Sequence, residues 1–333
     1  IYTIILIETV NFGDVKVKPG FKGYGKLIEV ELSDSSSIKL PIIVINGLND
    51  GPKMLISSAI HGGELIGFNV IRNLTRNILN PMELRGLVVA LPIGNPLGFQ
   101  FGERYSPQDH IFPKIDEPGD IGGSITQRIG ATVWKEVTSK MDLRFDIHGN
   151  YPPCTAFSSY KMNYPRVSEE NGKMAEATGL TVVYSNKPGT LAWNEEPGKD
   201  YQPVPSVLIE LIDARRITEV STDLGTRAVL NVMKAWDMID GEVEPQPKEY
   251  VWGGGWVEDG GILRASRGGV IQFTKTPGVL IEKDEVIAEI YNPYGDILEE
   301  IKFPFKGYIR AYTYPRHQAV NTGDIIAYIT HEK

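Results

Sequence analysis

Cysteine and histidine are both scarce in this chain of 333 residues, which holds one cysteine, Cys154, and five histidines. A single cysteine excludes an internal disulfide and a zinc site built from thiolates. We interpret Cys154 as a small buried apolar side chain, and a catalytic nucleophile is the alternative. Any metal site in this chain must therefore combine imidazole with carboxylate ligands.

Long hydrophobic runs are missing as well. No stretch approaches the roughly 18 consecutive apolar residues that a membrane-spanning helix needs. The first residues, Ile1 to Glu8, also lack the basic flank and the small-residue cleavage site of a secretory signal. We therefore expect a cytoplasmic protein with no membrane partner.

Basic residues are outnumbered by acidic ones, 34 against 42, which gives a formal net charge of −8. An acidic surface repels nucleic acid and anionic membranes, so we expect neither as a partner. The contents of 41% hydrophobic and 23% charged residues are typical of a globular protein, and the length fits about two domains. Composition and charge do not decide whether the protein forms a homo-oligomer.

Short apolar runs alternate with stretches that show helical spacing of their apolar residues. The expected strands are residues 54–60, 86–91, 143–147, 181–184 and 207–211, and the expected helices are residues 65–79, 124–141, 168–177 and 222–239. This alternation predicts an α/β fold with a mixed, largely parallel sheet flanked by helices.

A domain boundary is predicted near residue 241, where helical signals end and prolines stand among polar residues. We expect an α/β domain over residues 1–241, with a β segment at its start, and an all-β module over residues 242–333. Two similar blocks in this module, each a strand, a turn with Asp and a strand, predict a small barrel or sandwich. The module resembles a biotinyl/lipoyl carrier barrel, but the turn at residues 290–296 holds no lysine to modify.

Two short motifs point to a metal site. His61-Gly62-Gly63-Glu64 follows one expected strand, and His148 lies at the end of another. Carboxyl ends of parallel strands meet at one edge of a sheet, where two histidines and a glutamate would form a catalytic zinc site with an open position. Asp146, two positions before His148, could orient an imidazole by a hydrogen bond. The alternatives are a helix N-terminus at Glu64 and a structural Asp146–His148 pair.

A third carboxylate, Glu210, ends the most apolar expected strand. Near a water molecule that zinc activates, such a carboxylate can accept a proton and pass it to a leaving amine. The alternative is a solvent-facing glutamate that pairs with Arg215 or Arg216. We favour the base, because all three expected strands end at the same edge.

The order His61-x-x-Glu64, Asn95-Pro96, Arg104, Asp-x-His148 and a strand-terminal Glu resembles the succinylglutamate desuccinylase/aspartoacylase family, which has a zinc carboxypeptidase-like fold. The resemblance covers nearly the whole chain. It implies a hydrolase domain that binds one Zn²⁺ per chain through the two histidines and Glu64, with Glu210 as general base or acid. It also implies that Arg104 polarises the scissile carbonyl and stabilises its oxyanion.

The chain departs from the family pattern before Phe112-Pro113. Members usually carry an Asn-Arg pair there that grips the carboxylate of the substrate, whereas this chain has Asp109 and His110. We therefore expect Asn95, Asp109 and His110 to contact substrate, with Asp109 facing an amine portion that lacks a carboxylate or is cationic. Lys114 or Arg128 is the alternative replacement for the missing arginine.

These residues predict a zinc-dependent amidohydrolase that deacylates a small N-acyl compound, with the amide carbonyl polarised by zinc and Arg104. A metallocarboxypeptidase acting on small peptides is one alternative, although the Asp109-His110 pair leaves a peptide carboxylate without its expected partner. A catalytically inactive binding protein that keeps the fold is the other.

Overall fold

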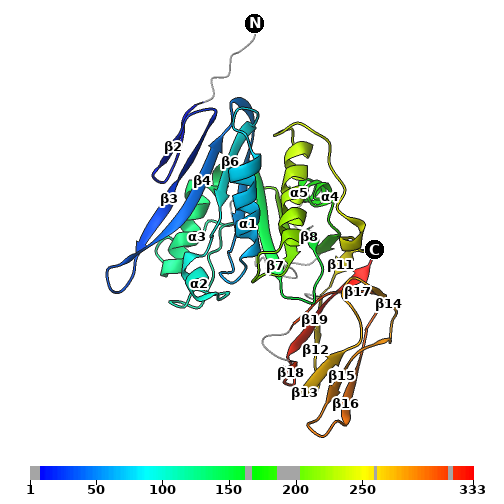
Figure 1. Ribbon diagram of the computed structural model, residues 1–333. Helices are drawn as coiled ribbons and strands as arrows, with labels where there is room; N and C mark the ends of the chain where they lie inside the picture. The colour runs from blue at the N-terminus through cyan, green and yellow to red at the C-terminus, as the bar shows by residue number, and fades with distance from the viewer. Residues whose placement is uncertain (1–7, 162–166, 186–202, 259–260, 314–317) are drawn as a thin grey trace.

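A mixed sheet of 13 strands runs through both parts of the chain (Figure 1). The computed structural model describes residues 8–161, 167–185, 203–258, 261–313 and 318–333. In order across the sheet, the strands are β14 (Leu280–Ile281), β17 (Gly307–Tyr312), β19 (Ile325–Glu332), β11 (Gly255–Val257), β9 (Val182–Ser185), β8 (Phe157–Lys161), β10 (Ser206–Ile212), β7 (Leu143–Asn150), β5 (Asn49–Ser58), β6 (Arg85–Leu91), β4 (Ser37–Asn46) and β3 (Phe21–Glu31), and β12 (Ile262–Arg264) pairs with β19.

Four neighbouring strands, β6, β5, β7 and β10, are parallel and form the centre of this sheet. Their middle residues are buried on both faces, which is why they read as continuous apolar runs in the sequence. From β5 the chain crosses to β6 on one side, while β7 lies on the other side of β5. Such a switch in strand order opens a crevice at the carboxyl ends of the strands.

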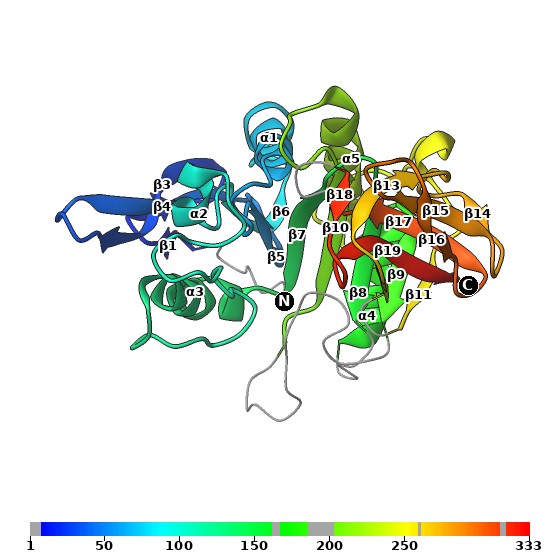
Figure 2. The same ribbon diagram turned by 90° about the horizontal axis from the view of Figure 1, so that it is seen from below.

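Helices cover both faces of the central strands. The helices are α1 (Ile66–Asn73), α2 (Pro96–Phe101), α3 (Ile125–Glu136), α4 (Ser168–Ala177) and α5 (Glu219–Ala235). Residues of α1, α4 and α5 share one apolar core, and α3 packs in a second core with β1 (Val10–Phe12) and β2 (Val15–Val17). Figure 2 shows α1 and α5 on one side of β5 and β7, with α3 on the other.

The predicted helices are present, with shifted ends. The first expected helix, residues 65–79, is α1 followed by a π-helical turn at Leu74–Ile78. The last begins at Glu219 instead of residue 222, because the Thr218 side chain accepts a hydrogen bond from Ser221 N and caps it. Ser124 caps α3 as expected, in a capping box with Gln127. The short α2 and strand β8 were not predicted.

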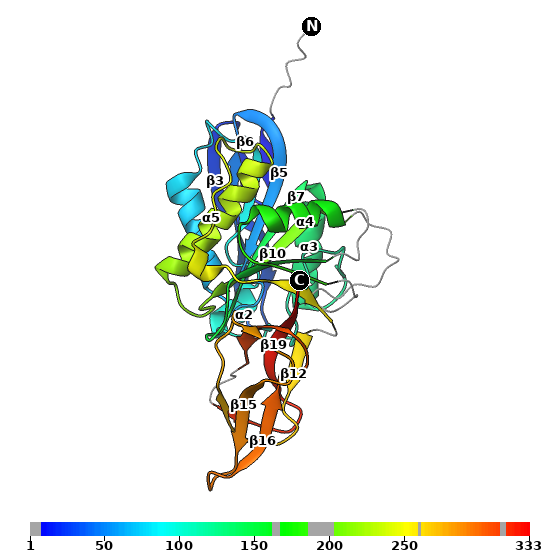
Figure 3. The same cartoon turned by 90° about the vertical axis from the view of Figure 1, so that its right-hand side faces the viewer.

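The C-terminal strands form two sheets around an apolar core (Figure 3). One is the end of the large sheet, and the other contains β16 (Ile297–Lys302), β15 (Val286–Tyr291), β13 (Gly269–Phe273) and β18 (Ala319–Val320). This arrangement is sandwich-like, and closure into a barrel stays a prediction. The mixed α/β class of the whole chain is confirmed. None of the described helices has the length and hydropathy needed to cross a membrane.

The division at residue 241 stays a prediction, and the large sheet crosses it. Strand β11 pairs with β9 on one side and with β19 on the other. Val257 of β11 and Trp252 also pack against Phe157 and Val183 of the α/β part. The two parts therefore share backbone hydrogen bonds and a small core.

Truncation after residue 241 tests how far the α/β part is independent. The shortened chain loses β11, so the edge of β9 and the Phe157 side chain become exposed, and an open edge promotes aggregation. We expect aggregation in size-exclusion chromatography and a lower melting temperature than for the full chain. A monomeric fragment with an unchanged melting temperature would contradict this.

Candidate metal centre and active site

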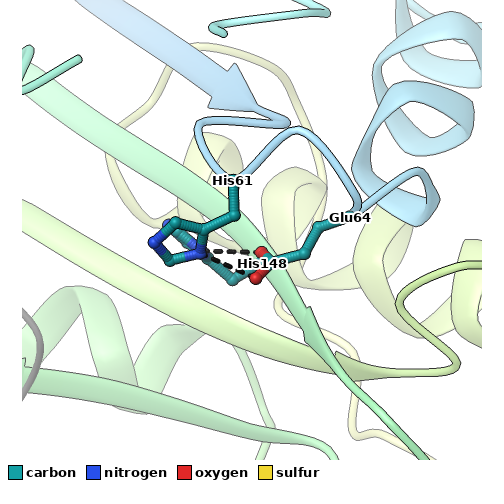
Figure 4. Close-up of side chains that lie close together, drawn as sticks. All are labelled: His61, Glu64 and His148. Atoms are coloured by element: carbon teal, nitrogen blue, oxygen red, sulfur yellow. Dashed lines mark hydrogen bonds and ion pairs between the residues drawn. The ribbon is translucent and has the colours of Figure 1, made fainter. Parts of the chain in front are cut away.

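Three potential metal ligands, His61, Glu64 and His148, converge at the carboxyl edge of the parallel strands (Figure 4). His61 and Glu64 lie in the loop between β5 and α1, and His148 lies on β7. The Nδ1 atom of His61 is 2.7 Å from Glu64 Oε1, and the Nδ1 atom of His148 is 2.8 Å from Glu64 Oε2. The two Nδ1 atoms are 3.1 Å apart, and all three side chains are buried.

The two glycines between His61 and Glu64 let this loop pack against α2. A Cβ atom on Gly62 would lie 2.1 Å from the carbonyl carbon of Gly98, and one on Gly63 would lie 2.7 Å from the carbonyl oxygen of Gly102. Side chains at either position would push the loop away from α2. The glycines thus keep His61 and Glu64 at the end of β5.

The donor set fits a single zinc ion. One ligand atom from each of the three residues lies within 4.8 Å of the others. Two imidazole nitrogens and one carboxylate oxygen are the protein ligands of many catalytic zinc sites, which keep a fourth position open. Other divalent ions accept the same donors, so the geometry supports a metal site without fixing the element.

The charges at this site favour an ionised Glu64. Burial alone would raise its pKa, but the charges and hydrogen bonds of His61 and His148 outweigh burial and hold the pKa well below its usual range. Burial lowers the pKa of His61. It acts in the same direction on His148, where the carboxylates of Asp146 and Glu64 prevail and raise the pKa. Glu64 is thus ready to bind a cation, whereas His148 must lose the proton that its neighbouring carboxylates favour before it can act as a ligand.

Asp146 contacts the ring of His148 from the side away from Glu64. Its Oδ2 atom is 3.2 Å from His148 Nε2, and it also pairs with the guanidinium of Arg144. Ser57 Oγ donates a hydrogen bond of 2.7 Å to Asp146 Oδ1. Because residues 144, 146 and 148 alternate along β7, all three side chains project from one face of the sheet. Asp146 is thus placed to fix the orientation of the imidazole.

Glu210 lies on β10 directly opposite His148 on β7. Its Oε2 atom is buried and accepts no hydrogen bond from the residues that the structure describes. Burial raises the pKa of Glu210 to about 7, and the negative charge of Glu64 contributes to this rise. Arg215 and Arg216, the alternative partners, instead contact the Tyr151 hydroxyl and the Asp213 carboxylate.

Arg104 was expected at this site, and Cys154 was interpreted as a buried, unreactive side chain. Arg104 is exposed and lies 5.5 Å from the centroid of Phe112, whose ring meets His61 edge-on at 4.9 Å between centroids. Burial raises the pKa of the Cys154 thiol to about 12, and the nearby charges of Glu210 and Asp213 add to this. Such a thiol stays protonated at neutral pH, which supports the interpretation of Cys154 as unreactive.

Comparison with known proteins decides the family. Residues 50–236, more than half of the chain, match the model of the succinylglutamate desuccinylase/aspartoacylase catalytic domain. The chain belongs to this family. The matched span contains β5, β7 and β10 together with every residue described above as a potential ligand or base.

Relatives cover nearly the full length. The N-alpha-acetyl-L-2,4-diaminobutyric acid deacetylase of Halomonas elongata is 22% identical over 337 residues, which cover 96% of this chain and 93% of that protein. A succinylglutamate desuccinylase/aspartoacylase from Rhodobacter sphaeroides has a similar structure, with a TM-score of 0.79, 23% identity and coverage of 94% and 95%. The product-bound structure of the ectoine utilization protein EutE (DoeB) from Ruegeria pomeroyi has a TM-score of 0.75 and 19% sequence identity. The match covers 93% of this chain and 94% of that chain.

The residues expected to bind substrate have other contacts in this family member. Asn95 caps α2, because its Oδ1 atom accepts hydrogen bonds from Gly98 N at 2.9 Å and Ser106 Oγ at 3.0 Å. His110 is exposed and has a positive φ of 58°. Lys114 pairs with Glu117 at 3.1 Å.

Asp109 is committed to the start of α3. Its Oδ2 atom accepts hydrogen bonds from Ser124 Oγ at 2.6 Å and Thr126 N at 3.0 Å, and its Oδ1 atom accepts one from Thr126 Oγ1 at 2.9 Å. This role differs from the expected contact with a cationic substrate. Sequence reasoning missed it because the partners lie 15 and 17 positions further along the chain.

Sequence reasoning also missed Phe112, Arg144 and Arg310. In the sequence, Phe112 stands out only as part of a Phe-Pro motif. Its packing against His61 depends on the course of a loop, which the spacing of apolar residues does not predict. Arg144 could have been found, because it continues the alternation of Asp146 and His148 on one strand face. Arg310 lies in the C-terminal module, where no motif in the neighbouring sequence marks it as part of a functional site.

Replacing Asp146 with Asn should weaken metal binding by about 10- to 100-fold, because the orienting charge behind His148 is lost. The measurement is zinc affinity by competition with a chromophoric chelator, alongside the melting temperature. Ser57→Ala, which removes one hydrogen bond to the same carboxylate, is a milder comparison. Unchanged affinity in a folded Asp146→Asn protein would show that Asp146 does not orient His148.

Replacing Asp109 with Ala should lower the free energy of unfolding by about 2 kcal/mol, because the start of α3 loses a charged hydrogen-bond acceptor. Urea denaturation measures this. Asp120→Ala serves as the control, since Asp120 is exposed and accepts a hydrogen bond from Gly122 N. A stable Asp109→Ala protein with an increased KM would instead support the predicted contact of Asp109 with substrate.

Proposed function

We propose that this protein is a zinc-dependent deacylase that hydrolyses the amide bond of a small N-acyl compound. The observation that carries the proposal is the convergence of His61, Glu64 and His148 beside Glu210, a carboxylate with a pKa near neutrality. Buried titratable groups with shifted pKa values, gathered at one edge of a sheet, are typical of functional sites. The family and the deacetylase relative support amide hydrolysis as the reaction.

Each proposed residue has one task. His61, Glu64 and His148 would hold the zinc, which when bound supplies a Lewis acid that polarises the amide carbonyl and favours ionisation of water. Glu210 takes a proton from the attacking water and delivers it to the nitrogen of the leaving amine. The Arg104 guanidinium stabilises the negative charge that develops on the carbonyl oxygen.

The acyl group and the amine define the range of substrates to test. The name of the Halomonas elongata relative supports an acetyl group on the α-nitrogen of an amino acid with a second amine. Because Asp109 is occupied by α3, its carboxylate no longer argues for an amine without a carboxylate. We therefore propose N-acetyl amino acids as the first substrate class and N-acyl amines as the comparison.

Zinc-loaded protein should release acetate from an N-acetyl amino acid, and Glu210→Gln should lower kcat by at least about 100-fold with the zinc content unchanged. Glu83→Gln is the matched control, because Glu83 is exposed beside the start of β6, at the opposite edge of the sheet. Absence of turnover across both substrate classes by the zinc-loaded protein would reject the deacylase assignment.

The pH profile follows from the same residue. Glu210 accepts a proton only as a carboxylate, and its pKa is raised to about 7. Activity should therefore fall as the pH decreases through this value, and a bound cation, which favours the carboxylate, shifts the acidic limb to lower pH. A profile of kcat/KM from pH 5 to 9, with no acidic limb at or below about pH 7, would argue against Glu210 as the base.

A further inference from the structure

Strand β17 of the C-terminal module pairs with the chain just after β7. Cys154 and Ala311 form an isolated antiparallel bridge. Thr155 N donates a hydrogen bond of 2.9 Å to the carbonyl oxygen of Arg310, and Tyr312 N donates one of 3.1 Å to that of Pro153. The backbone of Arg310 is therefore fixed next to the segment that follows the strand carrying His148.

The side chain of Arg310 is directed into the protein, with only 5% of the residue exposed. Its guanidinium carbon lies 5.6 Å from the ring centroid of Phe157 and 5.6 Å from that of Tyr328. Phe157 on β8 is the register partner of Glu210 on β10. Paired positions on neighbouring strands share a face of the sheet, so the Phe157 ring, which the guanidinium approaches, projects from the same face as Glu210. The Nη2 atom of Arg310 donates a hydrogen bond of 3.5 Å to the carbonyl oxygen of Gly261.

The charges of Arg310 and Glu210 are complementary. Burial lowers the pKa of Arg310 to about 10, and the charge of Glu210 opposes this fall. In return, Arg310 is one of the cations that oppose the rise in the pKa of Glu210. A buried charge that loses a nearby opposite charge is less well compensated, so we expect the two groups to stabilise each other in the interior.

We propose that Arg310 is a positioning residue whose buried charge favours the ionised Glu210 carboxylate and its place on this face of the sheet, so that residues 242–333 contribute to the active site and do not merely flank it. The proposal rests on the proposed function in that Glu210 is taken as the base. A guanidinium suits this task, because it keeps its charge and its planar shape when it is buried. The module thus supplies, from β17, a buried cation whose charge acts on Glu210.

The first test needs no substrate. A double-mutant cycle compares the melting temperatures of the full-length protein, Arg310→Met, Glu210→Gln and the double variant. Arg310→Met should lower the melting temperature more when residue 210 is Glu than when it is Gln, because only the first case leaves a buried carboxylate without its cation. Equal shifts in the two backgrounds would overturn the proposal, whatever reaction the protein catalyses.

The second test uses turnover of an N-acetyl amino acid. Arg310→Met should lower kcat by about 10- to 100-fold, as a misplaced catalytic group does, with a smaller change in KM and the zinc content retained. Arg310→Lys should recover part of the loss, because it restores a cation. Arg264→Met is the matched control, an exposed arginine on β12 of the same module.

The outcomes separate this proposal from the proposed function. An unchanged kcat in a folded Arg310→Met protein, or equal losses in the Met and Lys variants, would overturn the positioning role. If the unaltered protein turns over no N-acyl substrate, the deacylase assignment fails, and the double-mutant cycle alone decides the link between Arg310 and Glu210.

Discussion

Burial of the Glu64 carboxylate between two imidazole rings is the interaction on which the rest of the site depends. A negative charge at this depth is unfavourable unless cations or donors surround it, and His61 and His148 provide this from different segments of the chain. The ring of His148 in turn contacts Asp146, and Asp146 is held by Arg144 and Ser57. Each polar side chain in this series is thus paired with the next, and three of them, Arg144, Asp146 and His148, lie on β7.

Much of this chain could be predicted from the sequence, because parallel strands buried on both faces leave a clear signal. Apolar runs ending at Ile60, Ile147 and Ile209 placed the polar residues that follow them at one edge of the sheet. The structure brings His61, Glu64 and His148 together there and sets Glu210 opposite His148. The helices were likewise found by their apolar periodicity. A π-turn and the cap at Thr218 account for two of the shifted ends, and α3 and α5 also end before the expected positions, at Glu136 and Ala235.

The rest of the site depends on contacts between segments with no shared pattern. Asp109 follows the family motif in position, yet its carboxylate binds the start of α3, and only the folded loop reveals this. Strand β8 lacks a long apolar run because two of its buried residues, Ser158 and Ser159, are polar. Arg310 lies 100 positions after Glu210 and no shared pattern links the two, although both lie near Phe157. Composition and periodicity describe elements, whereas these residues are defined by how elements meet.

Because one sheet joins the C-terminal module to the α/β part, a charge from the module acts on Glu210. The carboxylate of Asp109 is bound to the start of α3. Outside the cluster of potential ligands, the positive charges of Arg104 and Arg310 act on Glu210. Both favour the carboxylate form of Glu210, and both oppose the influence of Glu64, which favours the neutral form. The net charge of −8 therefore says little about the substrate, because nearby charges set the field around Glu210. Glu64 and His148 have the larger effects on it, and the two arginines follow. A substrate that develops negative charge on its carbonyl oxygen suits that field, whether or not the departing amine carries a charge of its own.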